Sequence, residues 1–418
     1  MLDLRLIRRD PDGVRSALAR RGTDVAERLD GVLELDARWR AATASVESLR
    51  AEQKSASERV AAVKREGGDV SDVLRSLREL SGRVKALGEE ARAADEELQA
   101  ALRTLPNLPD PTAADADTVV REVGEPRAPV PDPKDHLELA GERIDMERGA
   151  HLSGSRFAYL RGELVLVELA LVRWAIDRLM AQGFEPVVPP VLVREEALYG
   201  TGFLPDTEQQ LYHLPADDLY LVGTSEVALA SLHAGEILAE DALPRRYAGF
   251  SSCFRREAGA AGKDTRGIFR VHQFDKVEMF CFVEPDASAA EHERLLAVEE
   301  GLLQELAIPY RVVNIAVDDL GASAAKKYDC EAWLPGQGRY RELTSCSNTT
   351  DFQARRLEIR HRAPGARRPE TLHTLNGTAV AVGRTIIALL ENGQREDGSV
   401  ALPECLQRWG APAVLAAA

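Results

Sequence analysis

The sequence predicts an α+β protein in which a long helical hairpin precedes a mainly antiparallel sheet flanked by helices. Three observations lead to this prediction: a 3.5-residue apolar repeat within residues 30–104, a proline-rich stretch at 105–134, and alternating strand-like and helix-like runs from 135 to 418. With 418 residues, 44% apolar and 29% charged, the chain is long and apolar enough for two or three globular domains.

The apolar repeat between residues 30 and 104 advances by steps of three and four residues in turn, as in a coiled coil. Gly67, Gly68 and Asp69 interrupt it once, so we expect two helices of about 50 Å each, folded into an antiparallel hairpin. Residues 31–104 carry 13 Lys and Arg against 14 Asp and Glu, so the arm repels a polyanion less than the rest of the chain does. The repeat alone is consistent either with an arm that extends toward a partner or with a coiled coil that joins copies of the chain. The positions of the repeat, all apolar except Gln53, are Val32, Leu35, Trp39, Ala42, Val46, Leu49, Gln53, Ala56, Val60, Val63, Val73, Leu77, Leu80, Val84, Leu87, Ala91, Ala94, Leu98 and Ala101.

Beyond the arm, residues 105–134 contain seven of the 21 prolines, which indicates an extended linker. The apolar pattern then predicts a long helix from Phe157 to Gln182 and a shorter one at Gly383–Glu391. Strand-like segments follow one another at 247–283, so we expect a mainly antiparallel sheet. The predicted strands are Leu219–Val222, Tyr247–Phe254, Ile268–Val283, Arg311–Ala316 and Arg339–Ser345.

Charge and cysteine usage narrow the classes of protein to consider. The net charge of −15 argues against broad, nonspecific nucleic-acid binding, although it leaves room for a local basic surface. The five cysteines are scattered without metal-ligand spacing, which disfavours a disulfide framework or a structural zinc site and suits a cytoplasmic protein. The first residues lack the apolar core of a signal peptide, and no run approaches the roughly 18 apolar residues of a membrane span.

The segment from Phe254 to Glu278 has the residues of a nucleotide site. Phe254-Arg-Arg-Glu257 and Arg266–Phe274 form two arms of a predicted hairpin joined by turn formers, and Lys276-Val-Glu278 follows. Arginine forks match phosphate or carboxylate oxygens, and a phenylalanine face stacks on a base. A glutamate on the same sheet can hold an ammonium group. The segment therefore predicts a nucleotide beside an amino acid, although a solvated, charged hairpin has the same residues.

Three shorter segments place polar groups at the ends of predicted elements. Thr224-Ser225-Glu226 follows a strand and suits either a small polar ligand or a helix N-cap. Glu342-Leu343-Thr344-Ser345 resembles a strand with Glu342 and Thr344 on one face, which either lines a site or meets solvent. Thr374–Thr378 leads into Gly383-Arg384, where the arginine near a helix N-terminus suits an anion or plain solvation.

Taken in order, these segments resemble seryl-tRNA synthetase, the class II family that activates serine with ATP and attaches it to tRNA. Gly183–Pro190 is similar to the first class II motif, which packs at the dimer interface, Phe254–Phe280 to the second, and Leu375–Asn392 to the third. The segments more specific to the seryl branch are Tyr199–Pro205, Ser345–Asn348 and Asp351–Arg356. The resemblance spans almost the whole chain.

The resemblance implies an organisation and a set of partners. It implies a tRNA-binding N-terminal domain at 1–104 with its arm at about 30–104, a linker at 105–134, and a class II catalytic domain at 135–418. It also implies a cytoplasmic homodimer that uses L-serine, ATP with Mg²⁺, and tRNA-Ser.

Residue by residue, the resemblance implies a role for each matching position. Arg255 would contact the ATP α-phosphate and the serine carboxylate, while Arg384 would hold the γ-phosphate. Glu342 and Ser345 would ligate Mg²⁺, which prefers hard oxygen ligands. Arg255, Glu257 and Arg384 form the implied catalytic set. The implied ATP-binding set adds Arg256, Val271, Phe274, Glu342, Leu343, Thr344 and Ser345, and the implied serine-binding set is Thr224, Ser225, Glu226, Arg255, Glu278, Asn376 and Thr378.

Within the adenine and serine sites the implied contacts are more detailed. Glu257 would meet the adenine amino group, Phe274 would stack on the ring, and Val271 would lend backbone contacts. Thr378, with Asn376 near it, would reach the serine hydroxyl. The chain departs from the family in two places: Gly223 stands where many relatives have proline, and Thr378 where many bacterial relatives have serine. The added methyl of Thr378 puts the volume of the serine pocket in doubt.

Two alternatives to an ordinary serine–tRNA ligase remain at this point. One is a duplicated enzyme that serves a secondary-metabolite or inhibitor-resistance role. The other is a coiled-coil binding protein whose synthetase domain is inactive. Arg255, Glu257, Glu278, Glu342 and Arg384 are all present, which argues against the inactive form.

Overall fold

The computed structural model describes residues 1–205, 210–258, 262, 264–363 and 365–418. These residues divide into two compact units, one of residues 2–106 and the other of Met1 with residues 107–418.

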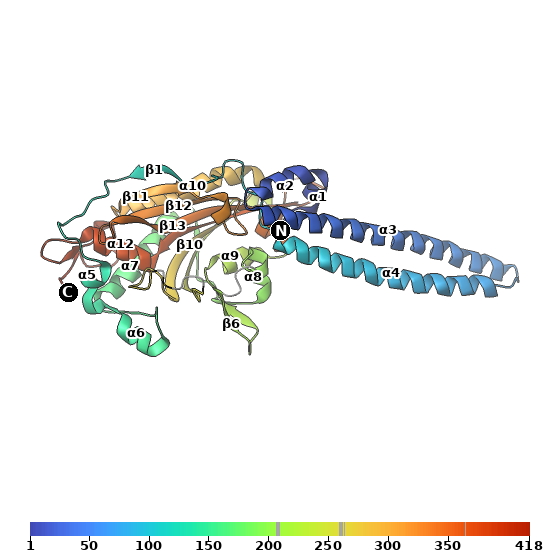
Figure 1. Ribbon diagram of the computed structural model, residues 1–418, viewed down its shortest axis with the longest axis horizontal. Helices are drawn as coiled ribbons and strands as arrows, with labels where there is room; N and C mark the ends of the chain where they lie inside the picture. Colours follow the sequence, from blue (N-terminus) through green and yellow to red (C-terminus); the bar gives the residue numbers. More distant parts are fainter. Residues whose placement is uncertain (206–209, 259–261, 263, 364) are drawn as a thin grey trace. The chain divides into compact units, whose positions relative to one another are not determined.

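The first unit is helical. Two short helices, α1 (Leu4–Arg9) and α2 (Pro11–Ala19), precede the long helices α3 (Thr23–Arg65) and α4 (Ser71–Thr104), which run antiparallel (Figure 1). Every predicted seam position is buried or half-buried, so the predicted coiled-coil hairpin is confirmed. The reversal lies at residues 66–70, where Gly67 has a φ of +74° that a residue with a Cβ rarely adopts.

One charge lies within the apolar seam of this hairpin. The carboxylate of Asp36 is 1% exposed and pairs with Arg8 at 2.5 Å and with Arg40 at 2.9 Å. Burial acts to raise the pKa of Asp36, but the hydrogen bonds and charges of the two arginines outweigh it and hold that pKa below its usual value. Asp36 therefore ties α1 to α3 within this unit.

The second unit is built on an eight-stranded sheet in the order β1-β11-β12-β13-β16-β10-β9-β4. All neighbours are antiparallel except β4 and β9, which confirms the predicted mainly antiparallel sheet. In sheet order the strands are Thr118–Val123, Tyr310–Asn314, Lys326–Leu334, Arg339–Thr350, His373–Ala381, Gln273–Val283, Arg245–Phe254 and Glu185–Val187.

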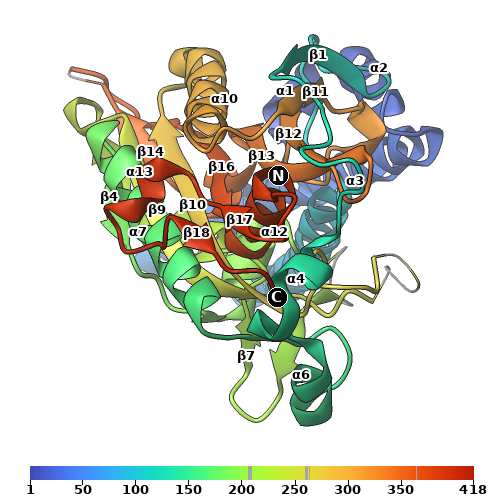
Figure 2. The ribbon, with the colours of Figure 1, turned by 90° about the vertical axis from the view of Figure 1, so that its left-hand side faces the viewer.

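Three helices cover one face of this sheet: α7 (Glu163–Ala181), α10 (Ser288–Glu305) and α12 (Val382–Gly393) (Figure 2). Val277, Met279 and Cys281 of β10 point into the core that these helices form. Successive strand residues face opposite sides, so Lys276 and Glu278 point to the other face. A cleft lined by Lys276 and Glu278 opens on that second face.

Shorter elements surround the sheet. β5, β7 and β6 form a small antiparallel sheet, and β8, β14 and β15 form another that includes one parallel pair. The bounds are α5 His136–Ala140, β2 Ile144–Asp145, α6 Met146–Ser153, β3 Tyr159–Leu160, β5 Leu192–Val193, α8 Glu195–Thr201, β6 Tyr212–Leu214, β7 Leu219–Leu221, α9 Glu226–Ala230, β8 Ile237–Ala239, α11 Phe352–Arg356, β14 Arg360–Arg362, β15 Glu370–Thr371, β17 Val400–Ala401, α13 Glu404–Gln407 and β18 Val414–Leu415.

The structure changes three of the predicted elements. The strand predicted at Ile268–Val283 begins only at Gln273, because residues 267–272 form turns at the edge of the cleft. The helix predicted from Phe157 begins at Glu163, after Gly162 with a φ of +58° and the short strand β3. The segment 105–134 is extended, and within it β1 pairs with β11 at the edge of the sheet. The turn predicted at 258–264 includes residues 259–261 and 263, which lie outside the described residues.

Among the described residues, no helix combines the length and apolarity that crossing a membrane requires.

Candidate active site

A cleft with about 850 Å³ of empty space, part of it open to solvent, lies on this second face of the sheet. Strands β10, β13 and β16 form its floor, and the N-terminus of α12 and the residues after β9 complete it. Its lining is Phe203, Thr224, Glu226, Arg255, Glu257, Ile268, Phe269, Arg270, Val271, Phe274, Lys276, Glu278, Glu342, Leu343, Thr344, Ser345, Asn376, Thr378, Ala381, Gly383 and Arg384.

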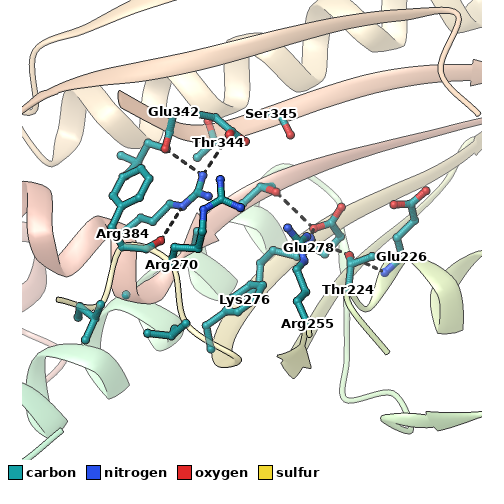
Figure 3. Close-up of a pocket in the computed structure, with 18 of the residues that line it drawn as sticks. Thr224, Glu226, Arg255, Arg270, Lys276, Glu278, Glu342, Thr344, Ser345 and Arg384 are labelled. Atoms are coloured by element: carbon teal, nitrogen blue, oxygen red, sulfur yellow. Dashed lines mark hydrogen bonds and ion pairs between the residues drawn. The ribbon is translucent and has the colours of Figure 1, made fainter. Parts of the chain in front are cut away.

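Segments that are far apart in sequence thus meet at one cleft. All of the sequence-predicted site residues line it except two. Ser225 is fully buried behind Thr224, and Arg256 is exposed beside the cleft with its backbone N–H donated to the carbonyl of Gln210. Figure 3 shows the acidic groups Glu226 and Glu278 at one end and Glu342 with Arg384 at the other.

The first end of the cleft holds a buried carboxylate with a lysine. Glu278 and Lys276 lie two residues apart on β10, so both side chains point from the same face, and they form an ion pair. Lys276 also donates from Nζ to the hydroxyl of Thr224 at 2.7 Å. Across the sheet Glu278 is in register with Thr378 of β16, whose hydroxyl approaches it to 3.5 Å.

A second buried carboxylate, that of Glu226, lies beside the first. Gln353 donates to its Oε1 at 2.7 Å, and Asn376 donates to its Oε2 at 3.4 Å. The same Asn376 amide approaches Glu278 at 3.3 Å, so it bridges the two glutamates. Burial, reinforced by the charge of Glu278, raises the pKa of Glu226 to about 7.

Arg255 lies between the two ends, just after β9 ends at Phe254. Its Nε donates to the carbonyl of Gly223 at 3.1 Å, and its guanidinium lies 5.2 Å from the centre of the Phe274 ring. One hydrogen bond and one aromatic contact hold the side chain while the remaining N–H groups of the fork face the cleft.

At the second end, two arginines pair with glutamates. Arg270 donates to Glu257 at 2.7 Å, and Glu257 has a φ of +50°, an uncommon conformation for a residue with a Cβ. Arg384 lies 3.3 Å from the Glu342 carboxylate and also donates to its backbone carbonyl at 3.0 Å. The Arg384 guanidinium lies 4.6 Å from the centre of the Phe269 ring.

The Glu342 carboxylate is ionised and reachable. Burial acts to raise its pKa, but Arg384 foremost, with Lys327 and Arg255, holds the pKa of Glu342 below its usual value. The side chain is 45% exposed, and Ser345 lines the cleft from the same strand. A carboxylate and a hydroxyl side by side form a hard-oxygen donor set.

Several supporting residues were not predicted as site residues. Lys276 could have been found from its position between Phe274 and Glu278 on one strand face. Gln353 comes from α11, 127 residues after Glu226, and no local pattern marks it. Glu299 of α10 lies beneath the floor, where its carboxylate accepts from the Thr344 hydroxyl at 3.0 Å. Burial raises the pKa of Glu299 well above its usual value.

A further unpredicted contact fixes the segment that enters β10. The backbone N–H of Ile268 donates to Nε2 of His136 at 3.3 Å, and Arg266 pairs with Asp135 at 2.8 Å. A Cβ on Gly267 would come within 2.0 Å of the His136 ring, so only glycine permits this approach. The start of α5 therefore positions the turn that carries Phe269 and Val271 to the cleft.

Comparison with known proteins agrees with this geometry. Residues 1–109 match the seryl-tRNA synthetase N-terminal domain, and residues 212–393 match the tRNA synthetase class II core domain (G, H, P, S and T). A serine–tRNA ligase of Thermobifida fusca is 54% identical over 414 residues, which cover 97% of each chain. One from Streptomyces coelicolor is 53% identical, covering 98% of this chain and 97% of the relative.

Solved structures show the same likeness. Seryl-tRNA synthetase from Pyrococcus horikoshii, complexed with ATP, superposes with a TM-score of 0.96 at 41% identity over 100% of both chains. The cytoplasmic serine–tRNA ligase from Naegleria fowleri, in complex with AMP, has a TM-score of 0.88 at 34% identity, covering 100% of this chain and 99% of that one. The chain belongs to the seryl-tRNA synthetase family, the class II ligases that join serine to its tRNA.

Proposed function

We propose that this cleft joins the carboxylate of L-serine to the α-phosphate of ATP, forming seryl-adenylate, and then passes serine to the 3′ end of tRNA-Ser. One observation carries the proposal. A single cleft has two buried glutamates at one end, suited to an ammonium group, and arginines at the other, suited to phosphates. Arg255 lies between them, where the two substrates would meet.

The first step is an attack of a serine carboxylate oxygen on the α-phosphorus of ATP, with pyrophosphate as the leaving group. Both reactants are anions, so they repel each other. Arg255 offsets that repulsion and fixes the line of approach, which is catalysis by positioning and charge stabilisation. Arg384 offsets charge on the departing pyrophosphate. The step uses no protein nucleophile.

Mg²⁺ fits the donors at the phosphate end. Glu342 supplies an ionised, half-exposed carboxylate and Ser345 a hydroxyl, and both are hard oxygen ligands. When bound, the ion supplies charge neutralisation for the phosphates. Glu342 is paired with Arg384 in the structure, so this pair has to loosen when Arg384 turns toward the γ-phosphate and Glu342 toward the metal.

The remaining nucleotide contacts follow from the lining. Phe274 offers a ring face for adenine, Val271 a backbone edge, and Glu257 a carboxylate for the amino group. Leu343 and Thr344 complete the wall at the phosphates. Arg256 contacts ATP in this proposal only from the exposed rim.

Selection of serine rests on hydrogen-bonding groups buried at the first end. Thr378 and Asn376 face the position of the serine hydroxyl. The serine ammonium group binds to Glu226, Glu278 and Thr224, and Ser225 lies behind them. Alanine leaves these groups unpaired, which costs several orders of magnitude, whereas threonine is excluded by volume alone. The methyl group of Thr378 narrows the pocket and works against the larger substrate.

We also propose the division of labour along the chain that the family implies. Residues 1–104 bind tRNA through the arm, 105–134 connect, and 135–418 catalyse. The arm's near-neutral charge supports this, because the rest of the chain carries almost all of the net −15.

The active form in this proposal is a cytoplasmic homodimer. Helix α7 exposes Val165, Leu166, Leu169 and Met180, and Leu169 is 60% exposed. Val188, in the motif after α7, is 81% exposed. Apolar side chains gathered in this way mark an interaction surface, and a second copy packed there would cover them.

Serine-dependent exchange of pyrophosphate into ATP, followed by charging of tRNA-Ser, tests the proposed reaction. Exchange and charging together support the ligase. Absence of exchange would overturn it and favour an inactive binding protein. Exchange without charging would favour a duplicated enzyme with another acceptor. Arg255, Glu257, Glu278, Glu342 and Arg384 all line the cleft, which counts against the inactive form.

Removing the arm separates its role from that of the cleft. A variant in which a short glycine linker replaces residues 31–104 should keep pyrophosphate exchange within about twofold, because the cleft lies wholly in the second unit. Charging of tRNA-Ser should fall by about a hundredfold or more, since the phosphate contacts that give affinity are lost. Normal charging by this variant would show that the arm is not the tRNA-binding element.

A further inference from the structure

We propose that Lys276 is a specificity residue of the amino-acid end: its fixed positive charge neutralises Glu278, so the subsite accepts one substrate cation and rejects amino acids that carry two. This inference rests on the proposed use of the cleft for serine. It concerns a residue that lies among the groups assigned to the substrate ammonium.

Lys276 is held rigidly in this position. Its side chain is 7% exposed, and its ammonium group pairs with Glu278 while donating to the Thr224 hydroxyl at 2.7 Å (Figure 3). A buried ammonium with two partners has little freedom to leave, because withdrawal would strand a carboxylate that is 1% exposed. Lys276 is therefore a fixed part of the wall of the amino-acid subsite.

The charges at this end are unequal once Lys276 is counted. Glu278 has a cation in contact, whereas the recorded partners of Glu226 are the neutral amides of Gln353 and Asn376. In the part of the chain that the structure describes, no lysine or arginine forms an ion pair with Glu226. The negative charge of Glu226 is thus left without a counter-ion, and burial makes that charge costly until a cation binds. The α-ammonium group of serine is that cation.

The hydrogen-bonding capacity of Thr224 leads to the same conclusion. Its hydroxyl oxygen already accepts from the backbone N–H of Glu226 at 3.2 Å and from Lys276. A hydroxyl has two acceptor positions, and an ammonium group can only donate. A substrate ammonium therefore finds its main acceptors on the carboxylates, and Lys276 decides which of them is available.

A cationic analogue of serine tests this charge balance directly. L-2,3-diaminopropionate has the shape of serine, but an amine replaces the hydroxyl. When that amine is protonated, the analogue brings two positive charges beside Lys276, against the two negative charges of Glu226 and Glu278. The excess charge has no counter-ion among these buried side chains, so the wild-type subsite should reject the analogue.

The experiment measures kcat/KM in pyrophosphate exchange, near neutral pH, for serine and for the analogue. Lys276→Met keeps the length of the side chain and removes its charge. It should shift the preference toward the analogue by about tenfold or more, because the pocket then has room for the second cation. Lys276→Arg keeps the charge and should keep the wild-type preference. The double variant Lys276→Met with Glu226→Gln has one fewer charge of each sign, so it should reject the analogue again.

Two controls separate charge from general damage. Alanine carries no extra charge, so the ratio of serine to alanine should change much less in Lys276→Met than the ratio of serine to diaminopropionate. ATP binding, measured directly without amino acid, reports whether the variant cleft is folded. If Lys276→Met does not fold, Lys276→Gln replaces it as the neutral variant.

The outcomes are distinct. An unchanged preference in a folded neutral variant overturns the role of Lys276 while leaving the ligase intact. Equal gains in Lys276→Met and Lys276→Arg also overturn it, because the arginine retains the charge. Absence of serine-dependent exchange in the wild type defeats the proposed function itself, before any variant is considered.

Discussion

The two ends of the cleft hold their charges in different ways. At the amino-acid end, Glu226, Glu278 and Lys276 are buried. Asn376 bridges the two glutamates and Lys276 pairs with Glu278, so the charges are fixed relative to one another. At the nucleotide end, Glu342 is 45% exposed and Arg270 31% exposed, and each has a partner of opposite sign. The small substrate thus meets a set of groups already in place, whereas the nucleotide meets ion pairs that can exchange partners.

This difference teaches what each end can discriminate. Fixed buried groups penalise any ligand that leaves one of them unpaired, which suits the choice between serine and alanine. Half-exposed ion pairs cost little to open, which suits a ligand that brings several charges of its own and a metal ion. Variants at the two ends should therefore change different kinetic constants, and by different amounts.

The largest effect should come from Arg255, the residue that serves both ends. Arg255→Ala should reduce pyrophosphate exchange by about a thousandfold, because it removes the group that offsets repulsion between the two reacting anions. Arg256→Ala makes the same chemical change in an exposed neighbour and should cost no more than about tenfold. Similar losses in both variants would mean that the cleft does not single out Arg255.

The amino-acid end is tested by Glu278→Gln, which keeps the shape and removes the charge. The KM for serine should rise by about a hundredfold, because Lys276 loses its counter-ion and the ammonium loses an acceptor. The KM for ATP should stay within about twofold of the wild-type value. Equal rises in both constants would show that the two ends are not independent.

The nucleotide end is tested by Arg384→Ala. The KM for ATP should rise by about tenfold or more, and the KM for serine should change little, because Arg384 contacts Glu342 and Phe269 rather than the buried glutamates. A larger effect on serine than on ATP would reverse the assignment of the two ends.

A smaller effect should appear in the pH dependence of serine use. Burial raises the pKa of Glu226 to about 7, and only the ionised carboxylate attracts an ammonium group. The value of kcat/KM for serine should therefore rise with pH up to about 7 and then level off, by several-fold overall. Glu226→Gln should lower kcat/KM and lose this step. A step that persists in the variant would have to come from another group.

The pH dependence that Glu226 gives to stability is opposite in sign to the pH dependence that it gives to serine binding. Because the folded-state pKa of Glu226 lies above its unfolded value, the folded protein holds more protons between about pH 4.5 and 7. The contribution of Glu226 to stability is thus present at low pH and is lost as the pH rises through about 7. The ionised form that binds the substrate is the form that burial disfavours.

Local patterns predicted the arm and the placement of most cleft residues. The seam of the coiled coil is a repeat within one stretch of sequence, so its burial followed from spacing alone. The cleft residues came from several short segments whose order resembles one family. Each of these segments contains a charged or polar residue, such as an arginine or a glutamate, whose chemistry can be read directly from the sequence.

The supporting contacts could not be predicted because they join distant segments through ordinary residues. Gln353 reaches Glu226 across 127 positions, and His136 reaches the backbone of Ile268 across 132. Neither residue carries a local signal, since its role depends on the sheet being assembled. The early start predicted for β10 failed for the same reason: residues 268–272 alternate like a strand, but His136 and Gly267 hold them in turns.

The narrow seam of the helical hairpin has a consequence for how the chain unfolds. In the half of the hairpin nearest its turn, from Val60 to Leu87, the apolar side chains at the seam are only half-buried, so separating the two helices there exposes little new apolar surface. That event has a small heat-capacity change and a weak dependence on denaturant, whereas loss of the eight-stranded sheet has large ones. The chain therefore does not unfold as one cooperative unit, and a single melting temperature would average two events. Substitutions in the cleft act on the second event and leave the first unchanged.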